Sequence, residues 1–314
     1  MMVARRRPAT FPDFCSLSPE WYGWYQERLY ELPQHSDFTL NNMLVWLGGD
    51  CGVECSAVDG SIVLRVSSSR VEALRGTWLT LLGPAVDRAT LDLVLQLAPG
   101  HKLRMVPDYV VSTACGADHV VAEDRDNFDY ILDVEGLAQM TGKKYERFRY
   151  QVRRFERLHG SDAAVRELNL RDPSDAAAVL GALVAWPRVN SFGPGGNDPT
   201  RTDQRAIEQL IRLQPELSVR HRCLGVFIRG RLRGFSIFHV PHARDPIGMG
   251  NHIKYDASFD RMFDYLVHVT ACDLREQGIH RVNADVDLGM PGLRRHKMQL
   301  RPVEFYKKYT VSGA

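Results

Sequence analysis

The sequence lacks the long apolar run that a membrane-spanning helix requires. No stretch reaches the roughly 18 apolar residues that cross a bilayer, and the arginines of residues 1–10 precede no apolar segment, unlike a secretory signal. We therefore expect a soluble, cytoplasmic protein with no integral membrane segment. An excess of one charge is also lacking, since the formal net charge is only +2. Nucleic-acid binding would therefore need a local basic patch.

Cysteine is sparse and scattered. There are six cysteines in 314 residues, and only Cys51 and Cys55 lie close together. Because no second pair and no His-x3-His segment completes a zinc site, we expect reduced thiols and no metal. The G-x-S-x-G elbow, the Walker loop and the H-E-x-x-H motif are missing as well. These absences leave no recognisable covalent nucleophile, phosphate loop or zinc-protease site.

What is present is the composition of a soluble globular protein, with 44% hydrophobic and 25% charged residues. The length favours two domains, which we place at residues 1–120 and 121–314, the second carrying the active-site cleft. Alternating runs predict hairpins turning at Asp59-Gly60 and at Gly230-Arg231. Interspersed helical patterns then predict an α/β fold with sheets packed against helices.

A polar strand near the C-terminus carries the first candidate chemistry. In VNADVD, residues 282–287, a period of two would place Asn283, Asp285 and Asp287 on one face. A half-exposed strand is one explanation. A ligand site is the other, because Asp competes for local backbone hydrogen bonds and is a poor strand residue.

Glycines and a proline in residues 289–292 predict a rigid loop that brings Arg294 and Lys297 near these carboxylates. Ligands tend to bind at such strand ends. The carboxylates could orient an ammonium group or act as a general base. Lys297 either stabilises an oxyanion, contacts a phosphate, or is a solvated lysine paired with an acidic neighbour. His252, in a predicted strand, is either an acid or base or a structural residue.

A basic helix is predicted over TGKKYERFRYQVRRFERLHG, residues 141–160. Tyr145, Phe148, Val152 and Phe155 recur at helical spacing and form its apolar face. Seven basic side chains lie beside that face: Lys143, Lys144, Arg147, Arg149, Arg153, Arg154 and Arg157. They form either a surface for tRNA phosphates or a solvated helix face.

Taken together, three segments resemble the C-terminal-like family of phosphatidylglycerol lysyltransferases, which have two tandem GNAT-type folds. The segments are HSDFTLNNMLVWL, DRDNFDYILDVEGLAQMTGKKYERFRYQVRRF and VNADVDLGMPGLRRHKMQLRPVEFYKKY. The family's D-x-G-x-x-G-L-R-x-x-K pattern, with a later proline, is matched by Asp287, Gly289, Gly292, Leu293, Arg294, Lys297 and Pro302. The basic helix is matched by Gly142, Lys143, Lys144, Arg149 and Phe155.

The resemblance implies two GNAT-like domains, each a mixed, mostly antiparallel sheet flanked by helices. It further implies a soluble aminoacyltransferase that moves an aminoacyl group from aminoacyl-tRNA, its co-substrate, to an amine or hydroxyl of a small molecule. Natural-product biosynthesis is one setting for such a step, and no cofactor is expected. On this basis Asp285, Asp287 and Lys297 are catalytic candidates. Asn283, Arg294 and His252 are substrate-binding candidates, and the seven basic residues of the helix are tRNA-binding candidates.

The chain departs from the family at one point of the site. Family members carry Arg-Glu where this chain has Ala284 and Asp285, so one charge is lost and the carboxylate is one methylene shorter. We expect this protein's own substrate preference to show there. Membrane-bound relatives also precede this unit with transmembrane helices, which are missing here, and this favours a small-molecule acceptor over a lipid.

Three alternatives stay open. The first is an acyl-CoA-dependent N-acyltransferase, the commoner chemistry of GNAT-type folds. Those enzymes usually have a glycine-rich pyrophosphate loop before the central helix, whereas KYDASFDRMF places Asp256 and Asp260 there. The second is a peripheral aminoacyltransferase acting on a phosphatidylglycerol-type lipid. The third is a binding protein that keeps the fold without the reaction.

Overall fold

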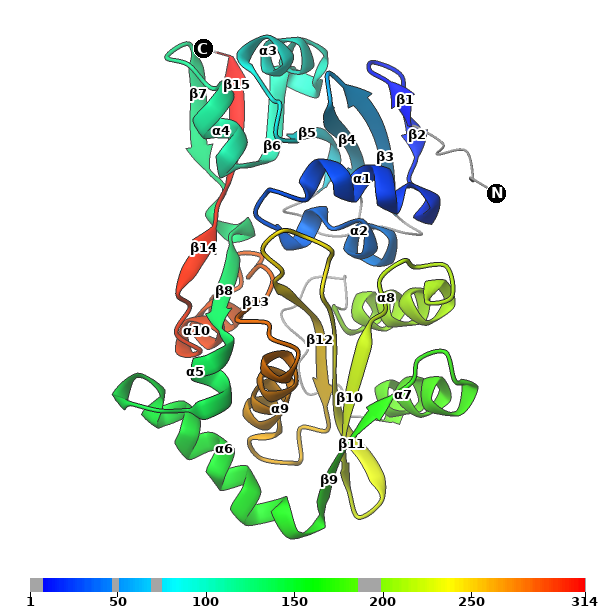
Figure 1. The fold of residues 1–314 in the computed structure, drawn as a ribbon, viewed down its shortest axis with the longest axis vertical. Helices are drawn as coiled ribbons and strands as arrows, with labels where there is room; N and C mark the ends of the chain where they lie inside the picture. The colour runs from blue at the N-terminus through cyan, green and yellow to red at the C-terminus, as the bar shows by residue number, and fades with distance from the viewer. Residues whose placement is uncertain (1–7, 47–50, 69–74, 186–198, 314) are drawn as a thin grey trace.

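The structure, a computed structural model, describes residues 8–46, 51–68, 75–185 and 199–313. Within them the chain forms two mixed β-sheets, one above the other in Figure 1, each flanked by helices. This arrangement confirms the predicted α/β class. The proposed boundary after residue 120 stays a prediction.

The first sheet has the strand order β1-β3-β4-β5-β6-β15-β7, with β2 paired to β3. Its strands are β1 (Ala9–Thr10), β2 (Cys15–Ser16), β3 (Cys51–Val58), β4 (Ser61–Ser68), β5 (Gly76–Leu82), β6 (Lys102–Pro107), β7 (His119–Glu123) and β15 (Lys308–Gly313). The predicted hairpin is confirmed: β3 and β4 are antiparallel, and Asp59 and Gly60 between them both have positive φ, as a two-residue turn requires.

Helices cover both faces of the first sheet. On one face lie α1 (Tyr22–Leu29), α2 (Leu40–Trp46) and the short turns η1 (Pro19–Trp21) and η2 (Ser36–Phe38); on the other lie α3 (Arg88–Leu97), η4 (Pro99–His101) and α4 (Asp108–Ala114). Trp24, Tyr25 and Leu29 of α1 are buried against β4. Figure 1 shows α1 and α2 on the side that faces the second sheet.

The second sheet has the order β14-β8-β13-β12-β11-β10-β9. Its strands are β8 (Asp129–Asp133), β9 (Ala163–Leu168), β10 (Arg222–Ile228), β11 (Arg231–His239), β12 (Gly248–Tyr255), β13 (Arg281–Asn283) and β14 (Glu304–Tyr306). β12 and β13 are parallel but share only two residue pairs, Gly248 with Val282 and Met249 with Asn283. Because β12 continues to Tyr255 while β13 ends, the two strands part at this point.

Its hairpin turn and a register shift with β12 both shape β11. The hairpin before it turns at Arg229 and Gly230, one residue earlier than predicted; both have positive φ, which this turn type needs and glycine favours. The pairing of β11 with β12 also shifts register, since Ile237 pairs with His252 but Phe238 pairs with Gly250. Asn251 is therefore the extra residue of a β-bulge, a feature that redirects side chains.

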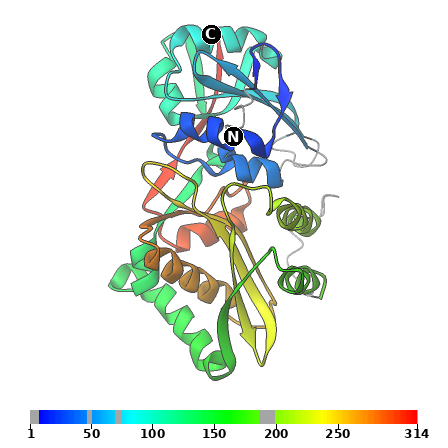
Figure 2. The same ribbon diagram turned by 45° about the vertical axis from the view of Figure 1, so that its right-hand side comes forward.

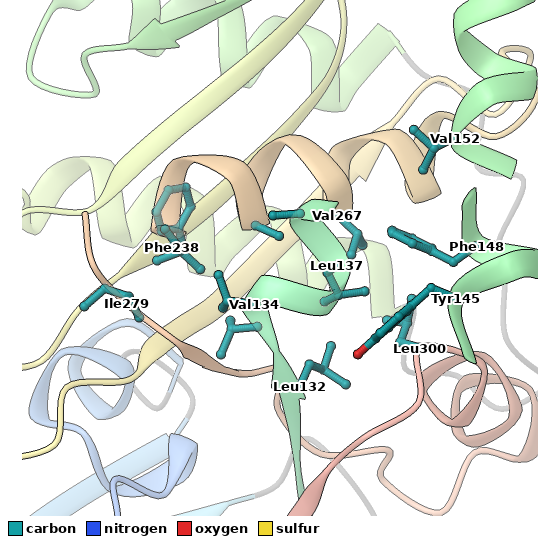
Figure 3. Packing of buried hydrophobic residues seen from close by; sticks show 14 of the residues in the cluster. Leu132, Val134, Leu137, Tyr145, Phe148, Val152, Phe238, Val267, Ile279 and Leu300 are labelled. Carbon is teal, nitrogen blue, oxygen red and sulfur yellow. The ribbon is translucent and has the colours of Figure 1, made fainter. Parts of the chain in front are cut away.

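Helices also cover both faces of the second sheet, as Figure 2 shows. On one face are α5 (Val134–Gln139), η6 (Lys143–Tyr145), α6 (Glu146–His159) and α9 (Met262–Glu276), with η7 (Gly160–Asp162) after α6; on the other are α7 (Pro173–Ala185) and α8 (Pro199–Leu213). The predicted helix is confirmed by α6: Phe148 and Val152 are buried in the core drawn in Figure 3, where Leu137 and Val267 also lie.

The chain passes between the sheets twice. It enters the second sheet from β7 through η5 (Arg125–Asn127) to β8, and it returns from β14 to β15. The two passages lie side by side, and Asp124 N donates to Lys308 O at 2.9 Å. The loop after β13 and the helix α10 (Pro291–Gln299) lie near this junction, and Ser36 of the turn η2 contacts Asp129 at the start of β8. The candidate residues of the loop after β13 and of α10 therefore lie near the junction of the two sheets.

Candidate functional site

The loop after β13 differs from the predicted strand. β13 ends at Asn283, and Asp285 has a left-handed φ of 66°, so the predicted alternation through residue 287 is wrong. The reason is local side-chain bonding. Asn283 Oδ1 accepts from Asp285 N, and Asp285 Oδ1 accepts from Val286 N, both at 2.8 Å. Such bonds compete with the ladder of a sheet, and Asp tolerates the left-handed conformation better than most residues.

The predicted placement of Arg294 beside the carboxylates is confirmed, but Arg294 and Lys297 lie on α10 and not in a loop. Pro291 is its first residue, where a missing N–H leaves no hydrogen bond unmade. Lys297 Nζ donates to Ala284 O at 2.7 Å and to Val286 O at 2.5 Å. The lysine thus holds the loop after β13. Burial lowers the pKa of Lys297.

Asp287 is fully buried with both oxygens engaged. Arg294 binds it in a bidentate manner, with Nε to Oδ2 and Nη2 to Oδ1 both 2.8 Å. Tyr130 Oη donates to Oδ2 at 2.5 Å, and Gly289 N donates to Oδ1 at 2.9 Å. Although burial opposes it, Arg294 holds the pKa of Asp287 below its usual range. Asp287 is therefore an ionised anchor for α10, supported by Arg125 Nη1 at 3.2 Å.

Gly289 is the residue that this anchor requires. Its φ is 71°, and a Cβ there would lie 2.7 Å from Asp126 Oδ2. Asp126 is needed in this place, since its Oδ1 accepts from Arg294 Nη2 at 2.7 Å. Any larger residue at position 289 would displace the second carboxylate of Arg294.

Side chains of the first half complete the site. Ser36 Oγ, in η2, lies 2.6 Å from Asp129 Oδ1 and 2.9 Å from Asp285 Oδ1. A hydroxyl has one hydrogen, so it can donate to only one of these carboxylates at a time. Oδ2 of Asp285 accepts from no donor in the described part of the chain. Asp285 is thus a half-buried carboxylate with an oxygen left for a ligand.

Lys308 lies beneath these carboxylates with no exposed surface. Its Nζ contacts Asp37 Oδ2 and lies 3.0 Å from Asp129 Oδ1. We call Ser36, Asp37, Asp129, Asp285 and Lys308 the junction cluster. Burial works against its charge, but Asp129 and Asp37 still raise the pKa of Lys308. The lysine is therefore a fixed cation.

Asp37 and Asp129 respond to this surrounding in opposite directions. Burial raises the pKa of Asp37 to about 6. The cation of Lys308 opposes this rise, and the negative charges of Asp129 and Asp285 add to it. Burial also opposes ionisation of Asp129, yet Lys308 and His35 lower its pKa. Paired carboxylates with separated pKa values are typical of acid–base sites. Asp37 is the titratable member near neutral pH.

Sequence reasoning missed most of the junction cluster. Asp37 and Ser36 fall within HSDFTLNN, and Asp129 opens the apolar strand DYILD, but neither carries a recognisable spacing. Their partners lie 93 or more positions away, as for Ser36 and Asp129. An acidic residue in an otherwise buried strand was the one available signal.

The predicted substrate-binding residues lie at different depths. Asn283 is buried, donates to Gln34 O at 3.2 Å and accepts from Asp285 N. Arg294 is occupied by Asp287 and Asp126, as described above. His252 is buried on β12, and burial lowers its pKa to about 3, so the ring is neutral. Substrate contact by these three residues stays a prediction.

The basic helix presents fewer free cations than the sequence indicates. Arg149 donates to Met140 O and to Gly142 O, and Arg154 Nε pairs with Asp260 at 2.8 Å. The remaining candidates are exposed; they are Lys143, Lys144, Arg147, Arg153 and Arg157. Figure 1 places α6 at the end of the second sheet away from the first.

The segment before α9, where a pyrophosphate loop would lie, is occupied by the chain's own carboxylate. Asp256 Oδ1 accepts from Ser258 N at 3.1 Å and from Ser258 Oγ at 2.6 Å. Asp256 Oδ2 pairs with Arg233 at 3.1 Å. Ser258 and Arg233, two donors that could hold an anion here, are thus already used by Asp256.

Within the described ranges, no helix is both long enough and apolar enough to cross a membrane.

Comparison with known proteins assigns a family. The family described as "Phosphatidylglycerol lysyltransferase, C-terminal" matches residues 33–312. Among proteins with curated descriptions, none matches the chain.

Solved structures share the fold. A conserved protein of unknown function from Bacteroides thetaiotaomicron is 19% identical, with a TM-score of 0.79 over 96% of this chain and 99% of that one. The C-terminal domain of a putative lysylphosphatidylglycerol synthetase from Agrobacterium fabrum is 14% identical, with a TM-score of 0.59 over 93% and 91%. L-PGS from Bacillus licheniformis is 14% identical, with a TM-score of 0.59 over 98% and 94%.

Proposed function

The chain belongs to the phosphatidylglycerol lysyltransferase C-terminal family, and from this premise we propose that it transfers an aminoacyl group from aminoacyl-tRNA to an amine or hydroxyl of a small molecule. Membership indicates an acyl- or aminoacyltransferase. The observation that carries the finer proposal is Asp285, whose Oδ2 is left for a ligand inside the junction cluster. A carboxylate in this setting suits an acceptor that arrives as an amine or hydroxyl.

The proposed reaction needs no covalent enzyme intermediate. The acceptor nitrogen or oxygen attacks the carbonyl carbon of the aminoacyl ester, and the 3′-terminal ribose oxygen of the tRNA leaves. The proton of the acceptor passes to a carboxylate, Asp285 or Asp37, and a proton is returned to the leaving oxygen. An ester is already activated, so alignment of the two reactants can supply on the order of 7–11 kcal/mol of the barrier.

Lys297 is the proposed partner of the developing oxyanion. Two of its three hydrogens are donated to backbone carbonyls of the loop that carries Asp285. Among the described residues the third hydrogen has no oxygen or nitrogen acceptor, only the Tyr130 ring 5.6 Å from Nζ, and it is proposed to meet a ligand oxygen. Asp287, with both oxygens engaged, is proposed to act through Arg294 as a positioning residue.

Exposed cations of α6 are proposed to contact tRNA phosphates. Lys143, Arg147, Arg153 and Arg157 lie on one helix and its preceding turn and have exposed side chains. Phosphate contacts of this type supply affinity without sequence readout. Natural-product biosynthesis is the proposed setting for a small-molecule acceptor.

Discharge of charged tRNA tests the proposal. The protein would be incubated with a mixture of aminoacyl-tRNAs and a small-molecule extract, and mass spectrometry would identify the product that gains an aminoacyl residue. We expect one tRNA species to be discharged well above spontaneous hydrolysis. Asp285→Asn should lose that activity, although Asn also tolerates the left-handed backbone. Asp13→Asn, a change at an exposed carboxylate, should keep the activity. No discharge of any tRNA would overturn the proposal.

The alternatives are separated by the same assay. Acetyl-CoA turnover on an amine would favour a CoA-dependent enzyme, which Asp256 disfavours by placing a carboxylate before α9. Product formed only when phosphatidylglycerol vesicles replace the extract would favour a lipid acceptor. A chain that binds charged tRNA but never discharges it would be a binding protein.

A further inference from the structure

A chain of side-chain hydrogen bonds leads from the junction cluster to β11. Asn42 Nδ2 donates to the carbonyl oxygen of Ser36 at 2.8 Å. Asn251 Nδ2 donates to Asn42 Oδ1 at 2.5 Å, and His239 Nδ1 lies 2.8 Å from Asn251 Oδ1. The bulge at Asn251 aims this side chain across to α2. The chain therefore joins the two halves of the molecule.

The direction of this chain fixes the tautomer of His239. A carbonyl oxygen such as that of Ser36 can only accept, so Asn42 must turn its amide nitrogen to it and its oxygen to Asn251. Asn251 then donates through nitrogen and turns its own oxygen to His239. The ring must supply the hydrogen, which places it on Nδ1. Nε2 of His239 is left as a lone pair.

That lone pair is buried and accepts no hydrogen bond from the described residues. His239 has 2% of its surface exposed, and Nε2 has no hydrogen-bond partner among residues 8–46, 51–68, 75–185 and 199–313. A buried acceptor without a partner costs about 1–3 kcal/mol. Native proteins rarely leave such a group empty, and water or a ligand usually satisfies it.

A second ring in the same condition lies beside it. His221 precedes β10, is equally buried, and has its ring centroid 4.5 Å from that of His239. Neither of its nitrogens has a partner in the described part of the chain. Burial lowers the pKa of His239 to about 4 and holds that of His221 well below its usual value. Both rings are therefore neutral at neutral pH.

The chemistry of these nitrogens selects the group that can bind. Neutral His221 offers one donor and one acceptor, and His239 Nε2 offers an acceptor only. A carboxylate or phosphate would face the lone pair and find no cation, and an ammonium would be buried without an anion. A hydroxyl can donate to His239 Nε2 and accept from the N–H of His221. An amide with an N–H does the same.

We infer that His221 and His239 form a subsite that binds a hydroxyl or amide group of the acceptor, separate from the group that reacts at Asp285. The inference rests on the proposed function. It narrows the acceptor to a molecule with at least two hydrogen-bonding groups, one held by each end of the chain from Ser36 to His239. A buried subsite of this kind would discriminate strongly against analogues that lack the hydroxyl or amide.

Nitrogen NMR of histidine-labelled protein tests this subsite without any tRNA. At pH 7 we expect Nδ1 of His239 to be protonated and Nε2 to be unprotonated. Ethylene glycol and acetamide should shift the signals of His239 and His221 saturably, whereas acetate and methylammonium at the same concentration should not. His280, an exposed histidine, serves as the internal control.

Two variants sharpen the result. His239→Asn keeps a donor for Asn251 but removes the ring acceptor, so binding of ethylene glycol read at His221 should weaken at least tenfold. His239→Gln places an amide oxygen near the lost Nε2, so binding should stay within about threefold. A proton on Nε2, or the absence of a saturable shift with either probe, would overturn the inference. Because no aminoacyl-tRNA is used, failure here leaves the proposed function standing, and failure of the discharge assay leaves this result standing.

Discussion

Lys308 Nζ lies 3.0 Å from Asp129 Oδ1, and neither side chain has any exposed surface. The two residues open β15 and β8, the strands that follow the two passages between the sheets. A single buried ion pair therefore fastens the return of the chain to its outward passage. Both residues also contact the candidate site, since Lys308 contacts Asp37 and Asp129 contacts Ser36. The same charges therefore join the two sheets and belong to the junction cluster.

Removal of Lys308 should destabilise the protein strongly. Lys308→Met leaves Asp129 buried without its cation, which typically costs about 3–5 kcal/mol. Urea unfolding would measure the loss. Lys307→Met is the matched control, since Lys307 pairs with Glu123 at the exposed surface and should cost no more than about 1 kcal/mol. Equal losses for the two variants would contradict the structural role of Lys308.

Asp37 should impose an acid limb on the rate of transfer. Its pKa is raised to about 6, so the fraction of the ionised base, and with it the rate, should fall about tenfold per pH unit below that value. Rates measured from pH 4.5 to 8 should show this limb. In Asp37→Asn the limb near pH 6 should disappear along with most of the activity, whereas persistence of the limb would assign it to another group.

The same carboxyl should be visible in stability. Its pKa is about 6 in the folded state against 3.8 ordinarily, so the folded state holds the proton more tightly. The stabilisation that this proton gives is complete below pH 4 and is lost as the pH rises through about 6. Asp37→Asn should flatten this part of the pH dependence of unfolding. An unchanged profile would contradict the raised pKa.

Arg294 and Arg295 should differ sharply although they are neighbours. Arg294→Ala leaves the buried Asp287 with only Arg125, Tyr130 and a backbone donor, and we expect a loss of about 3 kcal/mol in chemical unfolding. Arg295 is exposed, so Arg295→Ala should change stability by about 0.5 kcal/mol or less. If Arg294→Ala lowered stability by only about 0.5 kcal/mol as well, the bidentate pair with Asp287 would not stabilise the fold.

Gly289→Ala tests the tight turn before α10. The new Cβ would lie 2.7 Å from Asp126 and the φ is 71°. The steric clash and the backbone strain should therefore both lower the free energy of unfolding. Gly278 has a φ of 75° with open space around it, so Gly278→Ala reports the backbone strain alone, about 1 kcal/mol. We expect Gly289→Ala to cost a further 1–3 kcal/mol or so. Equal costs would mean that Asp126 moves freely.

Salt dependence tests the tRNA surface on α6. Replacing Arg153 and Arg157 by Ala should reduce the slope of log K against log salt by about 0.7–0.9 per lost phosphate contact. Filter binding at several salt concentrations would measure it. Lys102→Ala, an exposed change on β6 of the first sheet, is the control. An unchanged slope would make α6 a solvated helix face.

Sequence patterns predicted what depends on neighbours along the chain. The hairpin of β3 and β4, the apolar face of α6 and the family were all visible, because turn chemistry, helical periodicity and motif order are local signals. The strand through Asp287 was wrong because Asn283 and Asp285 bond to their own backbone. The loop predicted over residues 289–292 is cut short by α10, because Pro291 suits a helix start as well as a turn.

The junction cluster could not be predicted in the same way. Asp37, Asp129 and Lys308 come from three distant parts of the sequence and gain their properties only when burial brings them together. A raised carboxyl pKa is a property of that assembled environment. The hydrogen bonds of Arg149 could not be predicted for a similar reason, since its acceptors are backbone carbonyls just after the end of α5.

The place of β15 has a consequence for biosynthesis. This strand lies between β6 and β7 in the first sheet, yet the ribosome makes it after every strand of the second. The nascent first half must therefore wait with a gap in its sheet, exposing the edges of β6 and β7 to other chains, until residues 308–313 emerge.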